Sequence, residues 1–207
     1  MRARQAELDG PARGLVFQLC EALGTLPAKA AAAQCAALRR GDRKALARLG
    51  VRLGTETIYL EGALKRDAAE FASMLWAVKQ GAPAPALPSG AAAPRDPEIS
   101  ETAYAAMGYR VVGPRILRVD RLERLAAMAR QLARSGPFGP VAELAALGGG
   151  SIEDLAAMLS ALSYRVVRQE GGVTFHARRA AKARRRKRRS PPGDSPFAKL
   201  AELRLAQ

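Results

Sequence analysis

The residues whose types could support catalysis or metal binding are few, and their spacing fits neither. Cys20 and Cys35 lie 15 positions apart and His176 is the single histidine, so neither a four-ligand zinc site nor a thiol–imidazole pair is indicated. The sequence contains no phosphate-binding loop ending in lysine, no dinucleotide fingerprint, no His-Glu-x-x-His motif and no Gly-x-Ser-x-Gly elbow. We therefore predict no catalytic residue, no metal and no cofactor, and expect that this chain is not an enzyme by itself.

Basic side chains are the residues from which a function can be inferred. The net charge is +15, and Arg178 to Arg189 supplies nine of these charges because it holds nine basic residues and no acid. Such an excess predicts a polyanionic partner that is bound through sequence-independent phosphate contacts. We expect nucleic acid and no membrane, because the helix predicted beside the run is short and poorly apolar. The alternative is a basic tail that serves only solubility or loose adsorption to ribosomes.

A helix, a residue that ends it (here called the stop) and a short hairpin are predicted in succession at three places in the chain. Tyr104 to Val119 is the clearest instance, because the apolar spacing changes from helical to strand-like after Gly108. Similar stretches have their stops at Gly50 and Ser163. Two positions after each stop, an arginine lies inside an apolar strand, on the face opposite its neighbours. The three stretches are either repeats or independent instances of a common local structure.

The arginines of the later strands, together with the basic run, form the predicted nucleic-acid interface. Its residues are Arg110, Arg115, Arg118, Arg165, Arg168, Arg178, Arg179, Lys182, Arg184, Arg185, Arg186, Lys187, Arg188 and Arg189.

The pattern of elements predicts a mostly α protein with short β-hairpins, an α+β fold built from two small helical domains. Apolar residues on one face predict an amphipathic helix over 63–79, and Trp76 beside this face is expected to pack rather than to stack on a base. A helix over 43–49 leads into the first hairpin. The predicted parts are a helical domain 1–80 with hairpin 51–60, a Pro/Ala-rich linker or long surface excursion 81–98, a second domain 99–178, and a basic disordered tail 179–207 with a short terminal helix.

The second domain has the element order of a winged helix. Helices are predicted over 121–134, 141–147 and 151–162, followed by strands 164–168 and 173–177. In such modules the third helix can lie along a nucleic-acid groove while the hairpin contacts the backbone. The helix 151–162 has two acids and no Lys or Arg, so we expect it to pack internally or against a partner. Backbone contact is therefore assigned to Arg165, Arg168 and the basic run.

Several stretches together resemble the C-terminal region of a family of alphaproteobacterial ATP-dependent helicases, which is related to the mitochondrial degradosome RNA helicase. They are Ala12 to Gly24, Leu49 to Leu60, Leu75 to Gly81, Gly108 to Arg115 and Asp194 to Leu200. The resemblance implies a helical accessory region that follows two motor domains of a superfamily 2 helicase and helps to line the nucleic-acid channel, with RNA favoured over DNA as the ligand. The motor motifs are missing from this sequence, so the chain alone is expected neither to bind nor to hydrolyse ATP.

The alternative function is a protein-interaction module. The resemblance implies an exoribonuclease as one partner and a helicase motor in a longer or split gene product as another. A ribosome-associated protein is the other partner class of this alternative. Residues 195–207 are predicted to form a short amphipathic helix that docks through Phe197, Leu200 and Leu203. No secretory leader and no long apolar run are present, so a cytoplasmic location is expected.

Overall fold

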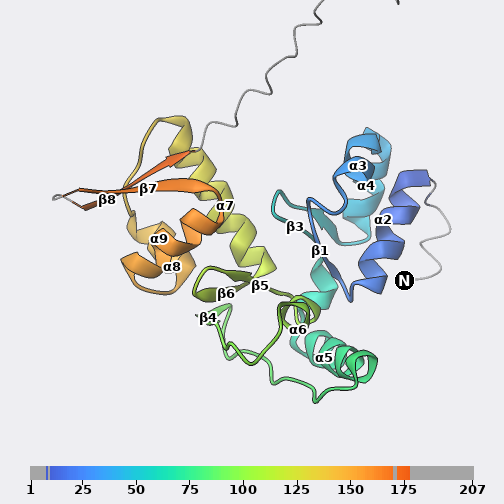
Figure 1. The fold of residues 1–207 in the computed structure, drawn as a ribbon. Coiled ribbons are helices and arrows are strands. Elements are labelled where there is room, and N and C mark those ends of the chain that lie inside the picture. Colours follow the sequence, from blue (N-terminus) through green and yellow to red (C-terminus); the bar gives the residue numbers. More distant parts are fainter. Residues whose placement is uncertain (1–7, 9, 170–171, 178–207) are drawn as a thin grey trace, which may run out of the picture. The chain divides into compact units, whose positions relative to one another are not determined.

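The computed structural model describes residues 8, 10–169 and 172–177 of the chain. Contacts divide the chain into Met1–Ala177 and Arg178–Gln207, and all described residues belong to the first part. Helices and small antiparallel sheets alternate along it, which confirms the predicted α+β class. The fold contains three successive modules, each with a helix, a short strand or bridge, one or two further helices and a hairpin (Figure 1).

The first module surrounds a core formed by helix α2 (Gly10–Glu21) and a three-stranded sheet. Its elements are α2 (Gly10–Glu21), β1 (Thr25–Pro27), α3 (Ala32–Ala37), α4 (Arg40–Arg48), β2 (Val51–Leu53) and β3 (Thr57–Leu60). The strand order is β1-β3-β2, with Leu26 and Leu53 both opposite Ile58. Leu15 and Leu19 of α2 and Leu46 of α4 are buried beside Ile58. The four-residue spacing puts Leu15 and Leu19 on one side of α2, whereas Phe17 is exposed.

The second module repeats this strand arrangement. Its elements are η1 (Glu61–Leu64), α5 (Arg66–Gln80), β4 (Ala92–Pro94), α6 (Glu101–Ala106), β5 (Tyr109–Val112) and β6 (Arg115–Arg118). The strand order is β4-β6-β5, so the strand that precedes the last helix again pairs with the second strand of the hairpin. Tyr104, Met107, Tyr109 and Ile116 form its core.

The third module has the helix and strand order that the sequence predicts for residues 121–177. Its elements are α7 (Val119–Arg134), α8 (Ala142–Gly148), α9 (Ile152–Ala161), β7 (Tyr164–Gln169) and β8 (Gly172–Ala177). An isolated antiparallel bridge between Phe138 and Phe175 stands where the first two modules have a third strand. Both phenylalanines join a core with Leu125, Leu144 and Met158.

The three predicted stops share one backbone conformation. Gly50, Gly108 and Ser163 have φ angles of 79°, 82° and 70°, the left-handed region that ends helices and that glycine adopts most readily. Two of the modules are also closed by equivalent hydrogen bonds, Glu61 N to Gly50 O at 2.9 Å and Val119 N to Gly108 O at 3.0 Å. The helix–stop–hairpin prediction is thus confirmed in all three places, whatever the origin of the repetition.

The predicted linker 81–98 contains a strand that the sequence pattern does not show. β4 pairs with β6 through residues 92–94, and Leu87 and Ala93 pack against the second core. The strand went unpredicted because its alanines give no hydrophobic alternation, whereas backbone pairing needs none. The sequence does not predict β1 either, because a strand of three residues is too short to show an alternating pattern.

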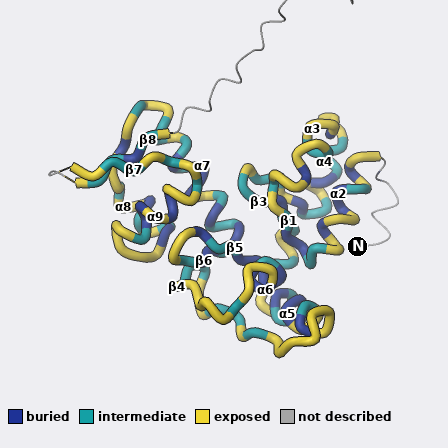
Figure 2. Tube along the Cα trace, in the orientation of Figure 1, coloured by how far each residue is buried: buried dark blue, intermediate teal, exposed yellow. Residues whose placement is uncertain are grey.

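Helix α5 also differs from the expectation of one buried apolar face. Its buried residues are the small ones, Ala69, Ala72, Ser73 and Ala77. The large residues Phe71, Met74, Leu75 and Val78 are 59%, 52%, 42% and 83% exposed, and Figure 2 shows exposed positions along this helix. Helix α5 contacts α6, and Ser73 among its small buried residues donates to the Pro85 carbonyl at 2.8 Å. The larger apolar residues are left toward solvent.

Candidate nucleic-acid interface

The hairpin β7–β8 presents two of the predicted phosphate contacts to solvent. Arg165 and Arg168 are both exposed, and within the described part of the chain neither side chain makes a hydrogen bond or an ion pair. Arg165 stands opposite His176 and Arg168 opposite Val173 in the strand register. Because side chains alternate along a strand, the two arginines lie on opposite faces of the hairpin. One flat ligand surface would therefore meet only one of them.

Arg110 in β5 is half-buried and makes a contact within the fold. Its Nη1 donates a hydrogen bond to the carbonyl oxygen of Glu56 at 3.2 Å. This bond connects the second hairpin to the turn of the first, and it leaves the other guanidinium nitrogens for further partners.

Arg115 is positioned for a structural role. Its side chain is 11% exposed, and its Nη1 lies 3.2 Å from Asp154 Oδ2. Asp154 is also the acidic member of the capping box that begins α9 at Ser151. The same arginine packs against Gly149 and Gly150, where an added Cβ would meet it. Arg115 therefore holds β6 to the start of α9, and phosphate contact by this residue stays a prediction that would require it to leave these partners.

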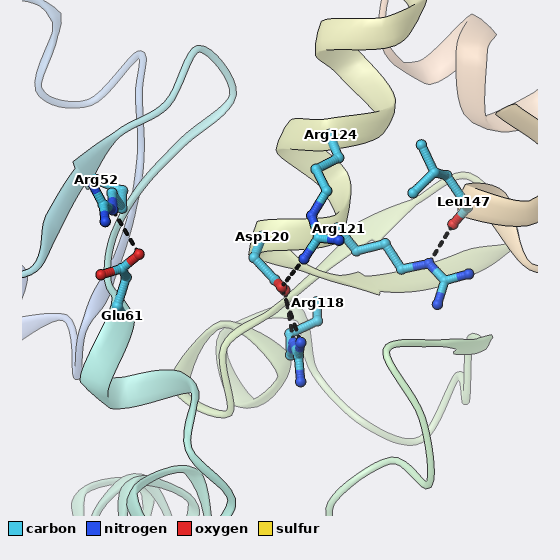
Figure 3. A network of polar contacts seen from close by, with 7 residues as sticks. All are labelled: Arg52, Glu61, Arg118, Asp120, Arg121, Arg124 and Leu147. Atoms are coloured by element: carbon cyan, nitrogen blue, oxygen red, sulfur yellow. Dashed lines mark hydrogen bonds and ion pairs between the residues drawn. The ribbon is translucent and has the colours of Figure 1, made fainter. Parts of the chain in front are cut away.

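Arg118 belongs to an ion-pair network at the start of α7 (Figure 3). Its Nε and Nη2 donate to Asp120 Oδ1 and Oδ2 at 2.7 and 3.0 Å, and Arg124 Nη2 donates to Oδ2 at 3.2 Å. Burial acts to raise the pKa of Asp120, but hydrogen bonds and charge from Arg118, with help from Arg124, lower it below its ordinary value. The hydrogen bond to Asp120 raises the pKa of Arg118.

A groove of about 790 Å³ lies beside this network, between α7 and α8. Arg121 lies in its wall and donates from Nε to the Leu147 carbonyl at 2.7 Å and from Nη2 to that of Ala146, which satisfies the carbonyls at the end of α8. Arg118, Arg121 and Arg124 face only two acids among the lining residues, Asp120 and Glu143. Of these three arginines only Arg118 belongs to the predicted interface, although their three-residue spacing along the chain was a usable signal.

A more exposed basic surface lies on α4, which the sequence analysis did not single out. Four of its nine residues are exposed cations, Arg40, Arg43, Lys44 and Arg48. At 100° per residue they fall within an arc of about 140° of the helix, with Arg43 nearest to the buried Leu46. The Nη2 of Arg43 donates a hydrogen bond to the Cys35 carbonyl at 2.7 Å. The single acid, Asp42, accepts a hydrogen bond from the Arg39 backbone N–H at 2.8 Å and is used in the helix cap. We call Arg40, Arg43, Lys44 and Arg48 the α4 basic face.

The α4 basic face occupies the position in its module that α9 occupies in the third. Both helices end at a left-handed stop and lead directly into a hairpin. α9 has Glu153 and Asp154 in its first turn and no basic residue, whereas α4 is basic along its length. Because a helix that contacts a nucleic-acid groove is normally basic, α4 fits that role better than helix 151–162 does. The signal was available in the sequence, but the helix was expected to begin only at Arg43.

The remaining predicted contacts lie outside the described residues. These are the basic run, Arg178, Arg179, Lys182, Arg184, Arg185, Arg186, Lys187, Arg188 and Arg189, and the docking residues Phe197, Leu200 and Leu203.

Metal sites and membrane-spanning helices can also be assessed over the described residues. Over residues 8, 10–169 and 172–177, no three His, Cys, Asp or Glu side chains converge as metal ligands would. No helix in this same portion is both long and apolar enough to cross a bilayer.

Comparisons of the chain with protein-family models, with curated proteins and with solved structures find no match. The site must therefore be interpreted from its own chemistry.

Proposed function

We propose that this chain binds nucleic acid, with RNA favoured over DNA, through electrostatic contacts to phosphates, and that it does no chemistry by itself. The observation that carries the proposal is the α4 basic face, four exposed cations on one side of a helix with its one acid turned to capping. The net charge of +15 supports it. The preference for RNA, and a place as the C-terminal accessory region of a superfamily 2 helicase, rest on the sequence resemblance alone.

The mechanism follows from how such a surface meets a polyanion. A winged-helix module can set the helix before its hairpin along a groove and the hairpin on the backbone, and the first module has α4 in that place. Cations at 1.5 Å rise per residue along one helix face can follow successive phosphates. Each neutralised phosphate releases counterions, so affinity must fall steeply as salt rises.

The test is a salt series of RNA binding by fluorescence anisotropy, with a 20-nucleotide single strand and its duplex. Replacing all four residues of the α4 basic face by Gln should lower the slope of log Kd against log salt by up to about 2.8, which is about 0.7 for each lost contact on a single strand. The charge-matched control replaces four exposed cations elsewhere by Gln: Arg13, Lys29, Lys65 and Arg134. Equal effects of the two variants would contradict a specific role for α4, and no binding by the natural chain at 50 mM salt would contradict the function.

The basic run is tested separately in the same assay. Neutralising the nine basic residues of Arg178 to Arg189 should reduce the salt slope by up to about 6. An unchanged slope would leave this run with a solubility role only.

A second candidate function, the protein-interaction module, is favoured by α5. Phe71, Met74, Leu75 and Val78 stand at i, i+3, i+4 and i+7 and are 42–83% exposed, the spacing with which an amphipathic helix enters an apolar groove of a partner. The partner we consider is an exoribonuclease, the class that the resemblance implies, with an apolar groove that receives this face of α5. Titration of a purified exoribonuclease of the same genome against the natural chain and a Phe71→Ser/Val78→Ser variant decides this, and equal affinities would contradict it.

A further inference from the structure

The turn of the β2–β3 hairpin surrounds a carboxylate with hydrogen-bond donors. The backbone N–H of Thr55 donates to Glu123 Oε2 at 2.9 Å, and the Thr55 hydroxyl donates to the same oxygen at 3.2 Å. The next two N–H groups, of Glu56 and Thr57, donate to Oε1 at 2.8 and 2.7 Å. Successive backbone N–H groups that converge in this way form a concavity that binds anions. We call residues 54–57 the hairpin tip.

Gly54 leaves room in the hairpin tip for this oxyanion. Its φ angle lies outside the left-handed region, so the backbone conformation does not call for glycine here. The reason is space, because a Cβ at this position would overlap the Glu123 carboxylate and the Thr57 carbonyl oxygen. Phosphate-binding loops use glycine in the same way, to let an anion approach the backbone. The hairpin tip therefore has both the donors and the space for an oxyanion.

Two arginines lie against the hairpin tip. Arg130 of α7 donates from Nη1 to the Thr55 hydroxyl oxygen, and Arg110 of β5 donates from Nη1 to the Glu56 carbonyl oxygen at 3.2 Å. Within the described part of the chain, neither arginine forms an ion pair with an acid. The tip itself contributes one acid, Glu56, so the surroundings of the Glu123 carboxylate have a net positive charge. Such a charge favours an anion at this place.

The oxyanion in the hairpin tip lies within reach of solvent. Thr55 is exposed, and Glu123 and Arg130 are only half-buried. Glu123 reaches the tip from α7, 66 to 68 positions away from its backbone donors. As an intramolecular ligand it has a high effective concentration, so a small free anion competes with it poorly. A polyanion held by the α4 basic face, on the helix that leads into this hairpin, also presents its phosphates at high local concentration.

We propose that the hairpin tip is a phosphate site, which Glu123 occupies in the free chain and which a phosphate of bound RNA takes over. The three N–H groups and the Thr55 hydroxyl that hold the carboxylate then hold non-bridging phosphate oxygens. The proposal rests on the proposed function, in which the hairpin after α4 meets the nucleic-acid backbone. It makes Glu123 an internal competitor of RNA, and its contact with the tip is a latch that RNA binding releases.

The first part of the test uses inorganic phosphate and needs no RNA. Melting temperatures of the full chain are measured at increasing phosphate, with chloride holding the ionic strength constant. At ten times the Kd, Glu123→Ala should gain about 3–6 °C more than the natural chain. Glu123→Gln, which conserves shape, is measured alongside and should also gain more than the natural chain, so the result does not depend on the folding of the alanine variant.

Two variants locate the phosphate. Gly54→Ala in the Glu123→Ala background should abolish the gain, because the added methyl group fills the space of the oxyanion. Glu153→Ala removes an exposed acid from the first turn of α9 and should respond to phosphate as the natural chain does. It is the matched control for the loss of one negative charge.

The second part of the test measures RNA affinity by anisotropy, with the single strand of the salt series. Removing an internal competitor makes the tip available without opening the latch, so Glu123→Ala should bind RNA about threefold or more tightly than the natural chain. Glu153→Ala should change the affinity much less, and Gly54→Ala/Glu123→Ala should lose the gain.

The outcomes separate the phosphate site from the proposed function. Absence of extra phosphate stabilisation in both Glu123 variants, or its persistence in Gly54→Ala/Glu123→Ala, would overturn the phosphate site while RNA binding by the natural chain stays in place. Phosphate stabilisation without tighter RNA binding by Glu123→Ala would overturn RNA as the ligand of the hairpin tip. Absence of any RNA binding by the natural chain would instead remove the proposed function.

Discussion

Glu123 offers the sharpest test of how the modules are fastened together. Its carboxylate accepts hydrogen bonds from the backbone N–H groups of Thr55, Glu56 and Thr57 at 2.9, 2.8 and 2.7 Å, and from the Thr55 hydroxyl at 3.2 Å. The turn between β2 and β3 thus forms a nest of converging donors around an anion that α7 supplies. We predict that Glu123→Gln destabilises the protein substantially although it conserves shape.

The magnitude follows from the donors that lose their acceptor. A hydrogen bond to a charged group contributes about 1.5–3 kcal/mol, and the Gln carbonyl can still accept some of the four, while its amide group faces donors. The turn is partly exposed, so water replaces part of the loss. We therefore expect a decrease of about 2–3 kcal/mol in the free energy of unfolding, which corresponds to a melting temperature lower by about 4–12 °C for a domain of this size.

Calorimetry and urea unfolding of the natural chain and of Glu123→Gln provide the measurement. Glu153→Gln is the matched control, because Glu153 is exposed in the first turn of α9, and it should change stability by less than about 0.5 kcal/mol. Gly54 adds a coupling test, since a Cβ there would meet the Glu123 carboxylate and the Thr57 carbonyl. Gly54→Ala should cost less in a Glu123→Ala background than in the natural chain. A loss below 0.5 kcal/mol for Glu123→Gln, or strict additivity with Gly54→Ala, would refute the reasoning.

Three further predictions concern the ion pairs of Asp120, the strand arginines and the exposed face of α5. The pKa of Asp120 is lowered in the folded state, so its ion pairs stabilise the protein fully above the unfolded pKa of about 3.9, and this stability is lost as pH falls through the lower folded pKa. Asp120→Asn should therefore cost about 1–2 kcal/mol at pH 7. In urea unfolding, the difference in stability from the natural chain should shrink below about pH 4. Arg115→Gln should lower the free energy of unfolding by about 1–3 kcal/mol. The double variant Arg165→Gln/Arg168→Gln should instead leave it within about 0.5 kcal/mol and reduce the salt slope of RNA binding by about 0.7, because one ligand surface meets only one of the two arginines. The opposite pattern in paired calorimetry and anisotropy would contradict the assignment. Val78→Ser, at an 83% exposed position, should change stability by less than about 0.5 kcal/mol, and a loss above 1.5 kcal/mol would show that this face is covered in solution.

The local features of this fold were predictable because short stretches of sequence decide them. The stops at Gly50 and Gly108 follow from glycine's access to positive φ, and Ser163 adopts the same conformation with φ 70°. The hairpins after them follow from apolar alternation and turn residues. The net charge of +15 is likewise a property of composition, and it directed the search to a polyanion.

The use of each arginine was decided by partners that are distant in the sequence. Arg115 and Arg165 are both strand arginines with similar neighbours, yet Asp154, 39 positions away, engages the first and the second is exposed. The α4 basic face was available to sequence reasoning, but its significance depends on comparing α4 with α9, and that equivalence becomes clear only when the strand orders of the modules are known.

By itself, the sequence determined where helices stop and hairpins follow, and that the chain is strongly basic, because these depend on backbone preferences and side-chain charge alone. Tertiary structure decided that α5 buries Ala69, Ala72 and Ala77 and exposes Phe71 and Val78. The physical reason is that burial depends on which surface the rest of the chain brings close. The same long-range packing brought the Glu123 carboxylate to the hairpin tip, 66 to 68 positions away in the sequence, which no local pattern could indicate.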